Sequence, residues 1–157
     1  MAEVNQAPII AEYIKVPGME EALLLEVGSQ VPKHAEVRYE LYGNDDRSLA
    51  GLTEYLKSPA KGVELSSSYY FDTDGNTVAV WWKMTWTFSG CADSLAVETS
   101  VSYLHPATHV FYEYATLADG DGNFIDPEPC TFPDIEREYA TFYHRDMLLL
   151  MRHLPFE

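Results

Sequence analysis

Apolar and polar residues alternate along four stretches in the middle of the chain, which is the pattern of half-buried β-strands. The first two stretches, residues 63–71 and 78–88, flank a polar turn at 72–77. The next two, residues 95–104 and 109–118, flank the short loop 105–108. We therefore predict two β-hairpins, each with one apolar face and one face of Ser, Thr and Glu.

Side-chain parity fixes the predicted register of each hairpin, because a slip by one residue would expose the apolar set. Pairing residue 71 with 78 places Val63 opposite Trp86. Pairing residue 104 with 109 places Tyr103 opposite Val110. We expect the apolar faces of the two hairpins to lie on the same side of one sheet.

The N-terminal third mixes strand and helix patterns. The predicted elements are a strand at 8–16, a short helix at 19–27 with a buried strand as the alternative, a strand at 35–42, and a helix from Asp46 to about Lys57. Pro17-Gly18 stops the first strand, and Ser58-Pro59 ends the second helix.

The C-terminal segment has the pattern of one long amphipathic helix. Thr131, Pro133 and Asp134 resemble a capped helix start, and the helix would run to about His153. Its apolar stripe would be formed by Ile135, Tyr139, Phe142, Tyr143, Met147, Leu150 and Leu154. The predicted fold is therefore a single α+β domain over residues 1–157, with an antiparallel sheet of four or more strands packed against this helix and one or two short N-terminal helices.

Charge narrows the classes of partner. The formal net charge is −15, and the stretch between Lys61 and Arg137 holds twelve acidic residues and a single basic one, Lys83. Such a chain repels nucleic acids and anionic membranes. A basic protein surface, including one that normally grips nucleic acid, is the partner that this charge favours.

The two cysteines, Cys91 and Cys130, are far apart and belong to no CxxC pair. We expect two free thiols in a reducing compartment, with a single disulfide as the alternative. The first residues lack the basic and apolar regions of a signal peptide. The sequence therefore predicts a cytoplasmic protein, in its own cell or in a host.

Three groups of residues invite a chemical interpretation that their spacing does not support. The Asp72–Asn76 and Asp119–Asn123 stretches look like calcium loops, but their later positions lack the ligands of an EF-hand. We therefore predict turns, with a weak cation site of another kind in 119–128 as the alternative. We interpret His105 and His109, with Glu113, as structural or surface residues, and His144-Arg-Asp146 as a solvated helix face. We predict no metal, no cofactor and no catalytic residue.

Three functions remain open at this point. The first is a non-enzymatic acidic interaction protein, such as an inhibitor, an immunity protein or a phage-type regulator, that binds its partner through Asp72, Asp74, Trp81, Glu98, Phe111, Glu113, Asp119 and Asp121. The second is a small-molecule pocket protein or an isomerase-type enzyme, with a cavity between sheet and helix lined by Tyr69, Trp82, Trp86, Tyr103, Tyr112 and Tyr114. The third is a structural subunit of a larger assembly, including a viral one.

Overall fold

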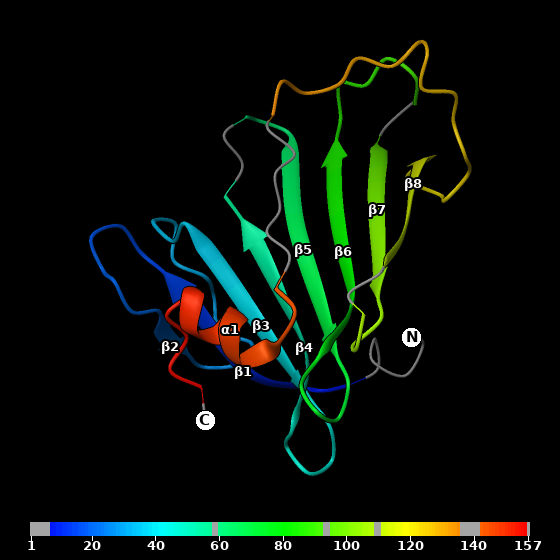
Figure 1. Ribbon diagram of the computed structural model, residues 1–157. Helices are drawn as coiled ribbons and strands as arrows, with labels where there is room; N and C mark the ends of the chain where they lie inside the picture. The colour runs from blue at the N-terminus through cyan, green and yellow to red at the C-terminus, as the bar shows by residue number, and fades with distance from the viewer. Residues whose placement is uncertain (1–6, 58–59, 93–94, 109–110, 136–141, 157) are drawn as a thin grey trace.

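The computed structural model describes residues 7–57, 60–92, 95–108, 111–135 and 142–156. They form eight strands and one helix: β1 (Ile9–Lys15), β2 (Leu23–Leu25), β3 (Val37–Gly43), β4 (Leu49–Leu56), β5 (Val63–Phe71), β6 (Thr77–Trp86), β7 (Ala96–Leu104), β8 (Phe111–Asp119) and α1 (Arg145–Met151). All eight strands belong to one antiparallel sheet in the order β2-β1-β3-β4-β5-β6-β7-β8, shown in Figure 1. From β3 to β8 each strand therefore pairs with the next strand in the chain.

One face of the sheet is covered by the C-terminal part of the chain. Helix α1 lies across β1, β3 and β4 (Figure 1), and its Leu148 is fully buried in a cluster with Tyr39, Leu41 and Leu52. Farther along the same face, Trp82, Met84 and Trp86 of β6 pack against Ile125 and Ile135. We call this covered side the inner face and the opposite side the outer face.

The first predicted hairpin is confirmed. In the β5–β6 pair Val63 lies opposite Trp86, Leu65 opposite Met84 and Tyr69 opposite Val80, as predicted. Only the pair next to the turn differs, because a shift in register after Tyr70 pairs Phe71 with Thr77 instead of residue 78. The turn between them uses Gly75 at φ +88°, a conformation that glycine adopts without steric cost. The parity of the apolar residues is therefore sufficient to place this hairpin's register.

The second hairpin forms with a register two residues away from the predicted one. Leu104 pairs with Phe111 and Tyr103 with Tyr112, so the connection between β7 and β8 is longer than expected. Val101 lies opposite Trp81 of β6, which is on the outer face. The apolar face of this hairpin is therefore on the opposite side of the sheet from Trp82 and Trp86, contrary to the prediction.

The predicted α+β fold with a long C-terminal helix is wrong: the structure is nearly all antiparallel sheet, with one helix of seven residues among those described. Residues 131–135 are not helical. Their backbone bonds to other segments instead, because Thr131 donates to the Ser89 carbonyl at 2.6 Å and accepts from Trp86 Nε1 at 2.9 Å. The part of the predicted helix at 136–141, including Tyr139, lies outside the described residues.

The two predicted N-terminal helices are also wrong. The segment at 46–57 contains β4, and the segment at 19–27 contains only the short strand β2. The alternative prediction for 19–27 is correct in giving a strand but wrong in burying it, since Leu23 and Leu24 are exposed. In β4 the residues from Leu49 to Glu54 are all buried, so both sides of the strand are covered. A strand buried on both sides loses the alternation that distinguishes it from a helix.

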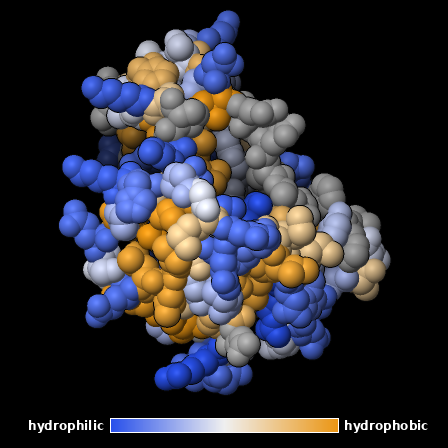
Figure 2. Space-filling view, turned by 90° about the vertical axis from the view of Figure 1, so that its left-hand side faces the viewer, coloured by the Kyte–Doolittle hydropathy of each residue, from blue (hydrophilic) through white to orange (hydrophobic). Residues whose placement is uncertain are grey.

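Apolar side chains also gather on the surface beside α1 and β2. Figure 2 shows this side of the molecule, with hydrophobic atoms over much of its lower half. The most exposed are Leu24 of β2 and Leu150 of α1, at 71% and 74%. A hydrogen bond from Ala22 N, just before β2, to the His153 carbonyl, just after α1, joins the flanks of the two elements. We call this the α1–β2 surface.

Candidate functional site

A groove runs along β8 on the inner face, where the segment after this strand folds back over the sheet. It has a volume of about 420 Å³ and is lined by Glu98, Ala115, Thr116, Leu117, Phe124, Ile125, Pro127 and Phe132. Most of this lining is apolar, and the Phe124 side chain is 80% exposed. Such exposure of a large aromatic residue beside a hollow is typical of a protein-contact surface. We call this hollow the β8 groove.

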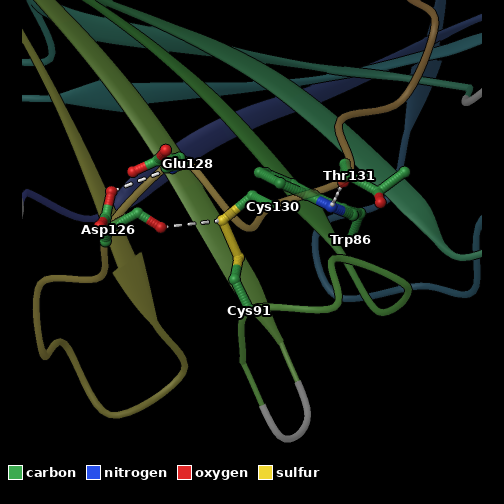
Figure 3. The surroundings of a disulfide bond; sticks show 6 residues. All are labelled: Trp86, Cys91, Asp126, Glu128, Cys130 and Thr131. Carbon is green, nitrogen blue, oxygen red and sulfur yellow. Dashed lines mark hydrogen bonds between the residues drawn. A yellow bond between two sulfur atoms is a disulfide. The ribbon is translucent and has the colours of Figure 1, made fainter.

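The wall of the β8 groove is fastened to the sheet at several points (Figure 3). A disulfide joins Cys130 to Cys91, which follows β6, with their Cα atoms 4.9 Å apart. Next to it, the Trp86 indole donates to the Thr131 carbonyl, and its ring lies 5.4 Å from that of Phe132. The groove is therefore held open by covalent and buried contacts, which lowers the entropy cost of binding.

The disulfide corrects the expectation of two free thiols, since the chain has no free cysteine. Sequence spacing could not reveal the pair, because 39 residues separate its members. Only the return of the chain over the end of β6 brings them together.

The segment that supplies the wall of the β8 groove is acidic, and we call its carboxylates the rim. Residues 119–134 contain five acidic side chains and no lysine or arginine. Of these, Asp119 also organises a turn, since it accepts hydrogen bonds from the backbone N–H groups of Asp121 and Asn123 at 3.0 and 2.9 Å. The Asn123 bonds hold the pKa of Asp119 below its ordinary value. Asp119 therefore stays negative at neutral pH.

The turn at 72–76 repeats this geometry at the other end of the sheet. Asp72 accepts from the N–H groups of Asp74 and Asn76 at 3.0 and 2.8 Å. Both calcium-like stretches are therefore hydrogen-bonded turns, as predicted. Among the residues that the structure describes, no group of three His, Cys, Asp or Glu side chains is arranged to hold a metal ion.

The predicted partner-binding residues do not form one surface. Strand register puts Glu98 and Glu113 on the inner face near the β8 groove, and Asp119 and Asp121 follow the end of β8. Asp72 and Asp74 lie at the opposite end of β5 and β6. Trp81 is on the outer face, and the side chain of Phe111 lies outside what the structure describes.

The predicted pocket residues are likewise divided between the two faces. Tyr69, Trp82 and Trp86 are buried among core residues of the inner face. The other three form a ladder of rings on the outer face at the β7–β8 edge, where Tyr114 lies 6.2 Å from Tyr103 and 6.1 Å from Tyr112. The structure therefore does not gather these six side chains around one cavity.

The structure describes only one of the two histidines, His105 and His109, that the sequence offers as metal ligands. His105 is exposed and accepts a hydrogen bond from Ala107 N at 3.2 Å, which closes its own loop, and His109 lies outside the described residues. His144 caps α1 by accepting from Asp146 N at 3.1 Å.

Sequence reasoning missed the aromatic residues of the groove, Phe124 and Phe132. Both lie in a segment whose pattern predicts an acidic loop and the start of a helix. The signal that could have found Phe124 is an isolated large apolar residue next to a turn rich in Asp and Gly, where nothing requires one. Phe132 carries no such signal.

Comparisons with protein-family models, with curated proteins and with solved structures find no match to this chain. Within the described residues, no helix is long and apolar enough to cross a bilayer.

Proposed function

We propose that this chain is an acidic interaction protein whose β8 groove binds a basic segment of a partner protein carrying an apolar side chain. The observation that supports this most is the groove itself, an apolar hollow with Phe124 exposed beside it and five carboxylates, with no lysine or arginine, in the segment that forms its wall. An apolar side chain of the partner would fill the hollow, and lysine or arginine residues on either side would meet the rim.

The two parts of this surface contribute differently. Burial of an apolar anchor in a preformed hollow supplies most of the affinity in typical interfaces. Charge on a solvated rim mainly raises the association rate and sets the preference for a basic partner. A net charge of −15 extends this effect over the whole molecule.

The test uses two fluorescent extended peptides rich in lysine and arginine, one with a central phenylalanine and one with alanine in its place. We expect the phenylalanine peptide to bind more tightly, and both to weaken as salt concentration rises. Phe124→Ser should remove the difference between the two peptides.

The chain offers a matched control for the charges, because Asp121 and Asp74 hold the same position in two similar turns at opposite ends of the sheet. Asp121→Asn should weaken binding and Asp74→Asn should not. Equal effects of the two variants would show that binding depends on net charge alone and would contradict the proposal that the peptide binds at the β8 groove.

A second candidate function, a subunit of a larger assembly, is favoured by the α1–β2 surface. Its exposed apolar side chains come from α1 and from the 19–27 segment that contains β2: Met19, Leu23, Leu24, Val27, Met147, Leu150 and Met151. Contiguous exposed apolar area of this kind often marks a contact between subunits. We infer self-association through this surface as the form it takes.

Light scattering after size exclusion tests this second candidate. We expect an oligomer that Leu150→Glu dissociates, while Leu56→Glu, a partly exposed leucine at the end of β4, leaves it intact. A monomer at all concentrations would exclude it.

A further inference from the structure

The outer face of the sheet carries rows of polar and aromatic side chains across its central strands. Directly paired residues put Arg38, Tyr55, Ser66 and Lys83 in one row from β3 to β6. The next row contains Glu40, Thr53, Ser68 and Trp81. Sheet faces exposed to solvent usually carry scattered polar residues, whereas here several of them are bonded to one another.

A hydrogen-bond network orders this face. The Glu40 carboxylate accepts from Arg38, from the Tyr42 hydroxyl, and from the Tyr55 hydroxyl at 2.9 Å. Burial by itself raises the pKa of Glu40, but these bonds outweigh it and hold the pKa below its ordinary value. Glu40 is therefore a fixed acceptor that orients the two tyrosine rings.

The network borders a hollow of about 270 Å³ between β3 and β6. Tyr42, Tyr55 and Tyr70 contribute rings and hydroxyls to its lining. The remaining lining residues are Lys83, Ser66, and the Thr53 and Ser68 pair, whose hydroxyls are hydrogen-bonded to each other. In the part of the chain that the structure describes, the Ser66 hydroxyl and the Lys83 ammonium group make no hydrogen bond or ion pair. A ligand in the hollow would find fixed rings and two uncommitted polar groups.

Charge decides which class of ligand fits. The strand residues on this face include three carboxylates, Glu12, Glu40 and Glu64, and two cations, Arg38 and Lys83. The local balance is therefore negative, in a molecule of net charge −15. An anion would be repelled by this field, whereas a neutral ligand would not.

Hydroxyl groups both donate and accept hydrogen bonds, and aromatic rings offer apolar area beside polar tips. A surface that combines tyrosine rings with serine and threonine hydroxyls, a lysine and a fixed carboxylate complements a compound with many hydroxyl groups on an apolar carbon ring. The hollow is close in volume to the lower end of ordinary small-ligand sites, about 300 Å³.

We propose that the hollow between β3 and β6 binds a neutral polyhydroxylated small molecule of the saccharide or cyclitol class. Lys83 and Ser66 would hydrogen-bond the ligand hydroxyls, and the rings of Tyr55 and Tyr70 would pack against its carbon skeleton. This site lies on the opposite face from the β8 groove and does not depend on the function proposed for that groove.

The test screens the chain against a printed array of neutral glycans, and follows myo-inositol, glucose and N-acetylglucosamine in solution by amide NMR shifts. We expect at least one of these probes or array glycans to bind saturably, with shifts centred on β4, β5 and β6. Inorganic phosphate and acetate are included as anionic probes.

Lys83→Met and Ser66→Val should each weaken that binding by about tenfold, the size expected for one lost hydrogen bond in each case, while Lys61→Met, an exposed lysine in a loop, should not. Since Lys83 is exposed, its replacement leaves the core intact, and circular dichroism of each variant verifies this. The proposal is overturned if no glycan or cyclitol binds, if phosphate or acetate alone saturates the hollow, or if Lys61→Met weakens binding as much as Lys83→Met.

Discussion

Glu54 of β4 and Arg152, which follows α1, form an ion pair that joins the sheet to the C-terminal helix. Arg152 donates to both carboxylate oxygens, with Nη2 3.4 Å from Oε2. The Glu54 side chain is 4% exposed and that of Arg152 31%. Burial raises the pKa of Glu54, against the opposing effect of Arg152. The buried carboxylate of Glu54 in β4 therefore depends on Arg152, at the end of α1, for its opposite charge.

Replacing Arg152 with methionine should lower the free energy of unfolding by about 3 kcal/mol, because it leaves a buried carboxylate without its cation. Urea unfolding followed by tryptophan fluorescence measures this. The double variant Glu54→Leu/Arg152→Met should regain most of the loss, since both charges are then gone. Equal losses in the single and double variants would mean that packing of Arg152, and not its charge, matters.

Opening the disulfide should destabilise the chain by up to about 4 kcal/mol, the loop-closure value for a ring of this length. Thermal unfolding of Cys91→Ser/Cys130→Ser against the oxidised chain gives the difference. We expect the tryptophan fluorescence of the folded double variant to change as well, because the segment that covers the Trp86 indole is no longer tied down. An unchanged melting temperature would show that the disulfide does not stabilise the fold.

Alanine at Gly75 should cost more than alanine at Gly122. Both glycines have positive φ, +88° and +86°, so each substitution loses about 1–2 kcal/mol in backbone strain. At Gly75 a Cβ atom would also lie 2.8 Å from His144 Nε2, whereas at Gly122 it would meet nothing within 4 Å. His144 caps α1, so displacing it adds about 1 kcal/mol. Chemical denaturation of both variants tests the order, and equal losses would refute it.

Glu40 should give the chain a component of stability that is lost in acid. Its pKa is lowered in the folded state from the ordinary 4.5, so its contribution is fully present above that value and disappears as the pH falls through the folded pKa. Unfolding free energies of the parent chain and Glu40→Gln, measured between neutral pH and acid, isolate this component from other carboxylates. The difference between them should shrink below about pH 4.5. A constant difference would contradict it.

Local turn chemistry is readable from the residues. The two Asp-x-Asp-Gly-Asn stretches predict turns, and their side-chain and backbone bonds are those of turns. Alternation in residues 63–86 predicts the register of β5 with β6 correctly. Both depend on contacts within a few residues or across one hairpin, and such contacts are encoded in adjacent sequence.

The helix predictions fail for a reason outside the segments concerned. Leu49, Leu52 and Leu56 have helical spacing, yet the segment pairs with β3 and β5 on its two sides. Thr131 and Pro133 resemble a helix start, yet Ser89 and Trp86 take up the hydrogen bonds of Thr131. Tertiary partners override local preference in both places.

The candidate sites are predictable only in part. The acidic character of the 119–134 segment is evident from its composition, and Phe124 next to its turn is a local signal. Nothing local shows that Phe124 and Phe132 line one groove. The outer-face hollow escapes prediction, because Glu40, Tyr55 and Lys83 come from three strands that are distant in the chain. Only pairing across β3 to β6 makes them adjacent.

By itself the sequence determined the negative sign of the surface charge, the two Asp-x-Asp-Gly-Asn turns, and which residues of a hairpin lie on the same face. Tertiary structure decided on which face of the sheet the apolar side of each hairpin lies. Alternation shows only which residues of one hairpin share a face. The faces of the two hairpins are related by the pairing of β6 with β7, in which Trp81 lies opposite Val101. It also decided the disulfide and the length of the helix. Each of these depends on contacts between segments that no local pattern of hydrophobicity records.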